Sequence, residues 1–351
     1  MERVSKHPVC IVGMHRSGTS MVARLLQLCG LDLGPKNMLM GASPSNQGGH
    51  FEHREFVDLN QALLERLGGS WDNPPDLKEG WERDPSLYEF TLRARKLITN
   101  FAPNARWGWK DPRTTLLLPF WKQLIPNMLY VICVRNPLDV ARSLADRDQM
   151  SIAGASELWY QYCRKAISET DPKFRIVTFF EDYFENPMRE FKKVAEFCGF
   201  TERMENAVIQ ETVLTDLRHQ VTSLRELLVE AEIPFEYKLL FLGLRQVLYL
   251  QTTGGKHEQQ MSDFSDEATV LVQKLETFRH NHPLAQLENE LARGKRLLDK
   301  SRFTLLEKEQ EIANLELANR GLMKFSEAVR NTLAYRFYRN VLKPLTGGRE
   351  M

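Results

Sequence analysis

The chain has 351 residues, of which 42% are hydrophobic, so it is long enough for one large α/β domain with an appendage and is not disordered throughout. Lysine and arginine total 47 and aspartate and glutamate total 46, so the overall charge gives no reason to expect a nucleic acid or a membrane surface as a partner. Any anion site must therefore be local.

The first predicted strand is the apolar run VCIVG at residues 9–13, and the sequence GMHRSGTS follows at residues 13–20. Its two glycines have the spacing of a phosphate-binding P-loop, whose usual form continues with Lys and then Ser or Thr. Here Thr and Ser follow the second glycine directly, so Arg16 is the cation of the loop. The amides of such a loop and the N-terminus of the next helix bind an anion whatever the side chains are.

A long segment rich in Trp, Gly and Pro runs from about residue 36 to 106. Unstructured linkers rarely carry so many aromatic residues. We therefore predict that its sequence NPPDLKEGWERDP, at residues 73–85, crosses the mouth of a site as a loop.

The second predicted strand, LYVICV at residues 129–134, is followed by Arg135. In a P-loop nucleotide hydrolase the corresponding strand ends in an Asp that holds Mg²⁺, so a cation there favours direct binding of phosphate without a metal. Ser143 lies eight residues after Arg135 on the predicted helix that follows. Arginine and a hydroxyl form a natural pair for a terminal phosphate dianion, so we expect two anion sites on one nucleotide.

A third apolar run at residues 174–179 completes the predicted sheet. Each run is followed by a segment of helical periodicity, which is typical of a parallel sheet with both faces covered. The fold class that we predict is α/β, with a P-loop NTPase-like parallel sheet flanked by helices and a C-terminal helical or coiled-coil extension. Ligands are expected at the carboxyl ends of the strands.

Residues 200–280 have a helical pattern, and Lys238 and Arg245 interrupt their most apolar stretch. The N-terminal apolar run is too short for a signal peptide. The five cysteines lack CxxC spacing and indicate buried thiols in a reducing compartment. We therefore predict a soluble, cytoplasmic protein.

After Pro283 the pattern changes to a heptad repeat. One row of the repeat is apolar, and it consists of Leu284, Leu291, Leu298, Leu305 and Ile312. The companion row of the repeat has few apolar residues. A dimeric coiled coil and a solvated helix packed back on the domain therefore both remain open. The basic amphipathic tail fits a partner, a membrane surface or the protein's own domain.

The predicted organisation has four parts. They are an α/β domain at residues 1–220, its helical completion at 221–283, the heptad helix at 284–322 and the tail at 323–351. For the heptad helix, pairing with a second copy, pairing with another partner and packing on its own domain all remain open.

Several motifs resemble those of sulfotransferases. GMHRSGTS resembles their 5'-phosphosulfate loop, VRNPLDVARS resembles their 3'-phosphate motif, and WGWKDPRTTLLLPFWKQL resembles the segment that carries a site lysine. With the GxFE and KDPR sequences, the chain resembles a bacterial branch of the sulfotransferase family that is often found near glycosyltransferases, over roughly residues 8–220. The resemblance implies 3'-phosphoadenosine 5'-phosphosulfate as the donor, 3'-phosphoadenosine 5'-phosphate as the product, no metal, and sulfuryl transfer to a hydroxyl or amine of a carbohydrate-like or small-molecule acceptor.

The same resemblance implies the residues that bind the donor. Those of the 5'-phosphosulfate loop are His15, Arg16, Ser17, Gly18, Thr19 and Ser20. Arg135 and Ser143 bind the 3'-phosphate. Arg218, in an LRH sequence later in the chain, also contacts the nucleotide. The structural alternatives are an ordinary strand-to-helix turn for the loop, a surface salt bridge for Arg135 and a plain helix face for Arg218.

Lys110 occupies the position at which the family's lysine approaches the bridging oxygen of the donor. Negative charge grows on that oxygen as the sulfuryl group leaves, so a preorganised ammonium there acts mainly in the transition state. A structural ion pair with Asp111 is the alternative.

The general base is less clearly marked. The familiar cytosolic sulfotransferases use a His shortly after the site lysine, where this chain has Asp-Pro-Arg. Other branches use a Glu, and Glu52 falls on the GxFE pattern, with Glu55, His50 and His53 as rivals. Asp111 is an alternative base, or a residue that orients Lys110.

Two other functions fit the sequence. One is a small-molecule or nucleotide kinase with a variant P-loop, and the other is a non-catalytic nucleotide-fold protein that acts through its C-terminal helix.

Overall fold

The computed structural model describes residues 7–43, 48–101, 106–200, 206–214 and 222–252, and scattered residues between 270 and 324. The chain divides into two compact units, Met1–Leu297 and Leu298–Met351. Arg218 and the tail beyond residue 324 lie outside the described residues, as do many positions of the heptad stretch.

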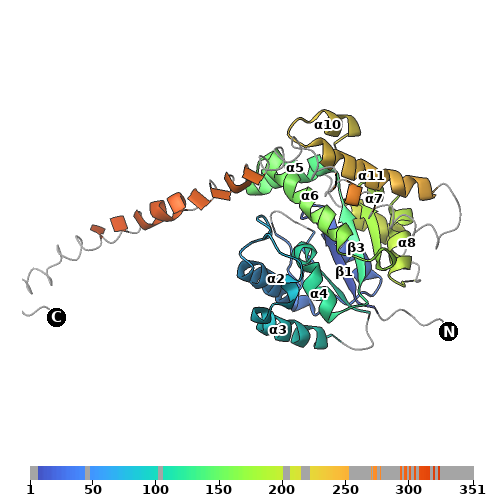
Figure 1. Ribbon diagram of the computed structural model, residues 1–351, viewed down its shortest axis with the longest axis horizontal. Helices are drawn as coiled ribbons and strands as arrows, with labels where there is room; N and C mark the ends of the chain where they lie inside the picture. The colour runs from blue at the N-terminus through green and yellow to red at the C-terminus, as the bar shows by residue number, and fades with distance from the viewer. Residues whose placement is uncertain are drawn as a thin grey trace, which may run out of the picture. The chain divides into compact units, whose positions relative to one another are not determined.

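The first unit is built around a parallel sheet of four strands in the order β2-β1-β3-β4. Figure 1 labels β1 and β3, which pair with each other in this sheet. The strands are β1 Val9–Gly13, β2 Gly108–Lys110, β3 Leu129–Val134 and β4 Arg175–Phe179. The α/β fold and the three predicted strands are thus confirmed. The sequence pattern missed β2, because a strand of three residues is too short to show a period.

Helices connect and cover the strands. They are α1 Thr19–Leu28, α2 Arg54–Arg66, α3 Tyr88–Thr99, α4 Leu118–Leu124, α5 Pro137–Asp148, α6 Ile152–Ser168, α7 Asp182–Glu185, α8 Pro187–Phe197, α9 Asn206–Leu214, α10 Leu224–Val229 and α11 Phe235–Thr252. Short 3-10 turns lie at Lys36–Met38, Trp81–Arg83, Pro85–Leu87, Pro112–Leu117 and Pro172–Phe174, and are labelled η1 to η5.

Alternate strand residues face two separate hydrophobic cores, as expected when both faces of a parallel sheet are covered. Val9, Ile11 and Val131 belong to the core formed with α1, α8 and α9. Cys10 and Val12 belong to the core formed with α2 to α6 and α11. The carboxyl edge of the sheet is left for the loops that carry the polar side chains.

Helices α5 and α6, which follow β3 along the chain, each begin at a polar capping residue. Asn136 begins α5, where its Oδ1 accepts from the amide of Leu138 at 3.0 Å, and Pro137 occupies the first turn. Ser151 begins α6, where its hydroxyl accepts from the amide of Gly154 at 3.1 Å.

The cysteines form no disulfides. Cys10, Cys133, Cys163 and Cys198 are buried, and burial raises the pKa of each of these four thiols. Cys29, at the C-terminal end of α1, is half-buried. Within the described residues, no helix combines the length and the hydropathy that crossing a bilayer requires.

The described residues of the second unit are helical up to residue 324, and 308–316 form their longest continuous stretch. Three members of the apolar heptad row, Leu298, Leu305 and Ile312, are 56–59% exposed. Within this unit they therefore project from the helix without burial.

Candidate active site

The turn between β1 and α1 has the backbone of an anion-binding loop. Gly13, Arg16 and Gly18 have φ angles of 130°, 69° and 82°, and left-handed residues of this kind let successive N–H groups point toward one centre. A Cβ atom at Gly18 would lie 2.5 Å from the Phe180 ring, so the position accepts only glycine without displacement. Because α1 begins at Gly18 without a side-chain cap, its first amides are left for a ligand.

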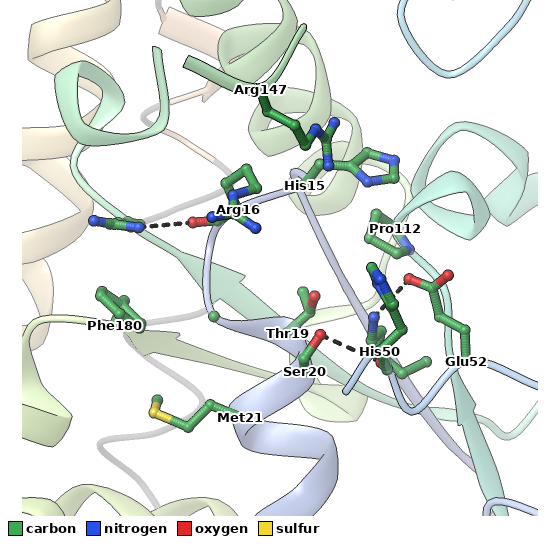
Figure 2. A pocket seen from close by; sticks show the side chains of 13 residues that line it. His15, Arg16, Thr19, Ser20, Met21, His50, Glu52, Pro112, Arg147 and Phe180 are labelled. Atoms are coloured by element: carbon green, nitrogen blue, oxygen red, sulfur yellow. Dashed lines mark hydrogen bonds and ion pairs between the residues drawn. The ribbon is translucent and has the colours of Figure 1, made fainter. Parts of the chain in front are cut away.

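A pocket lies directly over this loop, and each strand contributes to it at or just beyond its carboxyl end (Figure 2). Its lining consists of His15, Arg16, Gly18, Thr19, Ser20, Met21, His50, Glu52, Lys110, Pro112, Arg135, Arg147 and Phe180. The site thus lies where the parallel sheet predicts it. Its volume of about 90 Å³ is well below the roughly 300 Å³ of pockets that enclose a drug-sized ligand, so it is of a size for a small polar group.

Three arginines gather on one side of the pocket. Burial together with the charges of Arg147 and Arg135 lowers the pKa of Arg16 to about 10. Arg16 donates from Nε to the Ser143 hydroxyl at 2.8 Å, and Arg135 donates from Nη1 to the Arg16 carbonyl at 3.2 Å. Figure 2 shows Arg147 beside Arg16 and His15. Like charges held this closely favour an anionic ligand, because such a ligand relieves their repulsion.

Two buried polar atoms near the loop have no hydrogen-bond partner among the described residues. They are the Ser17 hydroxyl and Nε2 of His15. The His15 ring lies 4.6 Å from the Trp71 ring, and burial, together with Arg113 and Arg147, lowers the pKa of its imidazole. Buried polar atoms are normally paired, so both fit a site that is completed by a polar ligand.

Lys110, the last residue of β2, forms a buried ion pair with Glu52. Its Nζ donates to Glu52 Oε1 at 2.6 Å, and the two side chains are 2% and 6% exposed. Burial acts to raise the pKa of Glu52, but the charges of Lys110 and Arg113 outweigh it and the pKa is lowered. Glu52 is therefore an ionised carboxylate inside the pocket, in contact with the predicted site lysine.

Asp111 is fully buried and supports the neighbouring turn. It accepts from Nδ2 of Asn60 at 2.9 Å and from the Arg113 amide and Nη1, both at 3.0 Å. Burial is the main cause that raises the pKa of Asp111, and Arg113 opposes it. Asp111 does not line the pocket, and the carboxylate paired with Lys110 is that of Glu52.

The rival bases lie in different surroundings. His50 lines the pocket, and its carbonyl accepts from the Ser20 hydroxyl at 3.3 Å. Burial lowers the pKa of His50, with Glu52 opposing, so its imidazole is neutral at pH 7. His53 packs against Phe56 at the start of α2, and the exposed Glu55 lies in the first turn of α2, so neither lines the pocket.

The pocket brings together most of the predicted residues. Ser17 and Ser143 are not among the lining residues: Ser17 is part of the loop, and Ser143 lies next to Arg16, from whose Nε its hydroxyl accepts. The sequence NPPDLKEGWERDP does not cross this mouth as predicted: residues 74–77 line a separate cavity, and it is residues 50–52 of the insertion that reach the loop.

The sequence reading missed Arg147 and Phe180. Arg147 was detectable, because it lies four residues after Ser143 and so on the same face of α5. Phe180 follows the carboxyl end of β4 and lies under the Arg135 guanidinium at 4.4 Å from the ring centre. No polar pattern marks such a residue in a sequence.

A parallel sheet with a glycine-bounded anion loop at its carboxyl edge and cations converging on that loop is the architecture of α/β proteins of the P-loop type. Residues 8–203 match the model of the sulfotransferase family, which is more than half of the chain. The chain belongs to this family and is a sulfotransferase.

Solved structures similar to this chain are also sulfotransferases. The STF1 sulfotransferase of Mycobacterium tuberculosis H37Rv is 15% identical, with 67% of this chain and 77% of that chain covered and a TM-score of 0.42. The sulfotransferase domain of the Synechococcus PCC 7002 olefin synthase is 15% identical, with 81% of this chain and 99% of that chain covered and a TM-score of 0.39. The sulfotransferase STF9 of Mycobacterium avium is 13% identical, with 63% of this chain and 70% of that chain covered and a TM-score of 0.35. Among curated proteins, none matches the chain.

Proposed function

We propose that this sulfotransferase moves a sulfuryl group from 3'-phosphoadenosine 5'-phosphosulfate to a hydroxyl or amine of a carbohydrate-like acceptor, without a metal. The observation that carries the donor assignment is the cluster of Arg16, Arg135 and Arg147 over the P-loop, in which Arg135 is buried and the other two are half-buried. The acceptor class rests on the sequence motifs. The buried thiols favour a cytoplasmic location.

The anion loop and the end of β3 supply two subsites. The amides of residues 16–20 and the Arg16 guanidinium hold the 5'-phosphosulfate, as a helix N-terminus and a charge-assisted donor do for other anions. Arg135 holds the 3'-phosphate, and Ser143 positions Arg16 through its 2.8 Å hydrogen bond. Arg147, next to Arg16, adds charge on the same side.

Lys110 and Glu52 carry the chemistry. The acceptor oxygen forms a bond to sulfur while the bond from sulfur to the bridging oxygen breaks, and the acceptor proton passes to Glu52. Lys110 stabilises the negative charge that develops on the bridging oxygen. Because Glu52 is ionised and is held by Lys110 at 2.6 Å, it begins the reaction ready to accept a proton.

The pocket geometry favours Glu52 over the other bases. His50 also lines the pocket and is neutral, so it stays the second candidate. Asp111 is engaged by Asn60 and Arg113 behind the pocket, and a role in positioning Arg113 fits it better.

The test is a calorimetric titration of the full chain with 3'-phosphoadenosine 5'-phosphate and with ATP, each with and without Mg²⁺. Tight binding of the bisphosphate that is unchanged by Mg²⁺ is expected, because the cations of the pocket contact the phosphates directly. Preference for Mg-ATP would overturn the donor assignment. A screen of hydroxyl and amine acceptors with labelled donor then identifies the acceptor class.

A further inference from the structure

A second cavity lies apart from the active site. It is bounded by residues 74–77, by one face of α6, and by Arg293 and Arg296 near the end of the first unit. Its volume is about 320 Å³, within the range of roughly 300–1,000 Å³ that is usual for small-molecule sites. None of its lining residues lines the pocket over the P-loop.

Helix α6 supplies a polar stripe to this cavity. Glu157, Gln161, Arg164 and Lys165 follow one another at helical spacing and lie on one face. Arg296 approaches the same helix at Gly154, where an added Cβ would lie 3.1 Å from both Cα and Cβ of Arg296. The absence of a side chain at Gly154 therefore lets the backbone at Arg296 approach α6.

Arg296 is the feature that points to a ligand. Its side chain lines the cavity, the residue is 3% exposed, and its Nε and Nη1 have no hydrogen-bond partner among the described residues. Burial of a guanidinium whose N–H groups lack acceptors is unfavourable in free energy. An anion that accepts hydrogen bonds from these groups removes this penalty.

The charge around Arg296 is unbalanced. Four cations line the cavity, namely Arg164, Lys165, Arg293 and Arg296, against the two carboxylates Asp76 and Glu157. Glu157 is already engaged, because it accepts from Gln161 Nε2 at 2.6 Å and from the Tyr237 hydroxyl. The lining of the cavity therefore carries an excess of positive charge, in which Arg296 is buried, Arg164 and Lys165 are half-buried and Arg293 is exposed.

This cavity and the active site share no lining residue, and side-chain contacts connect their surroundings. The Tyr162 hydroxyl, next to Gln161 on α6, donates to the Trp71 carbonyl at 2.8 Å, and the Trp71 ring contacts His15 of the first pocket. A ligand in the second cavity therefore does not occupy the position of the donor phosphosulfate.

We propose that this cavity is a second anion site, which takes the phosphate, sulfate or carboxylate group of a small polar molecule. Arg296 and Arg164 are the main donors to the anion, and Lys165 and Arg293 supply further charge. The residues 74–77, with two prolines and a leucine, offer an apolar side to the rest of the molecule.

The experiment is calorimetry of the full chain with inorganic phosphate after the first pocket has been saturated with 3'-phosphoadenosine 5'-phosphate. One further binding event is expected, weakened about tenfold or more in Arg296→Gln and in Lys165→Gln, since each loses a charge-assisted contact. Lys192→Gln, an exposed lysine on α8, is the control and should bind phosphate as the unaltered protein does.

Thermal melting of each variant shows whether it is folded, and Lys165→Gln, at a partly exposed position, tests the site independently if Arg296→Gln is unstable. Absence of the second event, or an event that both folded variants leave unchanged, overturns the proposal. If the bisphosphate does not bind, the donor assignment fails, but phosphate binding that depends on Lys165 still supports the second site.

The same titration with a phosphorylated and a sulfated monosaccharide separates the sources of the anion. Tighter binding of a sugar ester than of inorganic phosphate supports a site for an organic acidic ligand. Equal affinity supports a site for the free oxyanion.

Discussion

Lys110 and Glu52 face each other at 2.6 Å in surroundings that exclude most water. Because the folded-state pKa of Glu52 is lowered, its ionised form contributes to stability above its ordinary value of 4.5. That contribution is lost as the pH falls through the lower folded-state value. At neutral pH the pair is therefore fully charged, and the base needs no deprotonation step.

For Glu52→Gln we expect turnover to fall by roughly 10²- to 10⁴-fold while donor binding is kept, because the shape is preserved and the proton acceptor is lost. The unaltered enzyme should lose turnover on acidification only below pH 4.5, since Glu52 titrates below its ordinary value. Turnover and its pH profile are the measurements. His50→Gln is the matched variant, and a larger loss in it than in Glu52→Gln would assign the base to His50.

Lys110→Met should abolish most turnover and also lower stability by about 3–5 kcal/mol, because it leaves the Glu52 carboxylate buried without its hydrogen-bonded partner and with only Arg113, at 3.8 Å, as a cation. The double variant Lys110→Met with Glu52→Gln should recover much of the stability and none of the turnover. Denaturant unfolding and single-turnover kinetics separate the two effects. Recovery of turnover in the double variant would contradict the assigned roles.

Arg135→Ala should weaken binding of 3'-phosphoadenosine 5'-phosphate by about 1.5–3 kcal/mol, the scale of a charge-assisted contact. Affinity for the nucleotide that lacks the 3'-phosphate should barely change. Calorimetry with the two nucleotides measures the difference. An equal loss for both would mean that Arg135 acts through its contacts with Arg16 and Phe180 instead.

At the scale of elements, the turn into α1 depends on glycine for two reasons, a left-handed backbone and the close approach of Phe180. Gly18→Ala should therefore displace the loop and weaken donor binding strongly. Gly30→Ala is the matched control, since Gly30 also has a positive φ of 95° but has open space where a Cβ would lie. It should lose only about 1–2 kcal/mol of stability and keep its donor affinity. Thermal melting and calorimetry of the two variants are the measurements. Similar losses of donor affinity in both would show that backbone strain, and not the contact with Phe180, weakens binding.

The sequence predicted those elements that are determined by residues close to one another in the chain. Strands β1, β3 and β4 were visible as apolar runs, so Arg16 and Arg135 could be placed just beyond strand ends at the carboxyl edge of the sheet. Lys110 came from the family resemblance alone, because β2 was not predicted. The pairing of Glu52 with Lys110 joins residues 58 positions apart across an insertion, and no period in the sequence encodes such a contact. For the same reason the second cavity was missed, since it joins α6 to Arg296 across more than a hundred residues.

At the scale of the whole molecule, the boundary between the two units falls after Leu297, and Arg296 is buried in the first of them. The exposed heptad residues Leu298, Leu305 and Ile312 are in the second. We propose that this row pairs with a second copy of the chain, as leucines at heptad spacing do in coiled coils.

Truncation after Leu297 should therefore give a folded, donor-binding monomer, whereas the full chain should sediment as a dimer. Truncation after His282 removes Arg296 as well, and it should also melt at a lower temperature because the contact with α6 is lost. Sedimentation and thermal melting of the three chains are the measurements. A dimer that persists without residues 298–351 would place the interface elsewhere.

Helix α1 joins the anion loop at one end to Cys29 at the other, over a distance of about 15 Å. The remaining four thiols are buried and resist ionisation, so a maleimide dye added to the native protein attaches at Cys29. The fold thus provides a single labelling position on the helix that begins at the anion loop. A fluorophore there should report binding at the loop in the unmutated enzyme, without an acceptor and without a coupled assay.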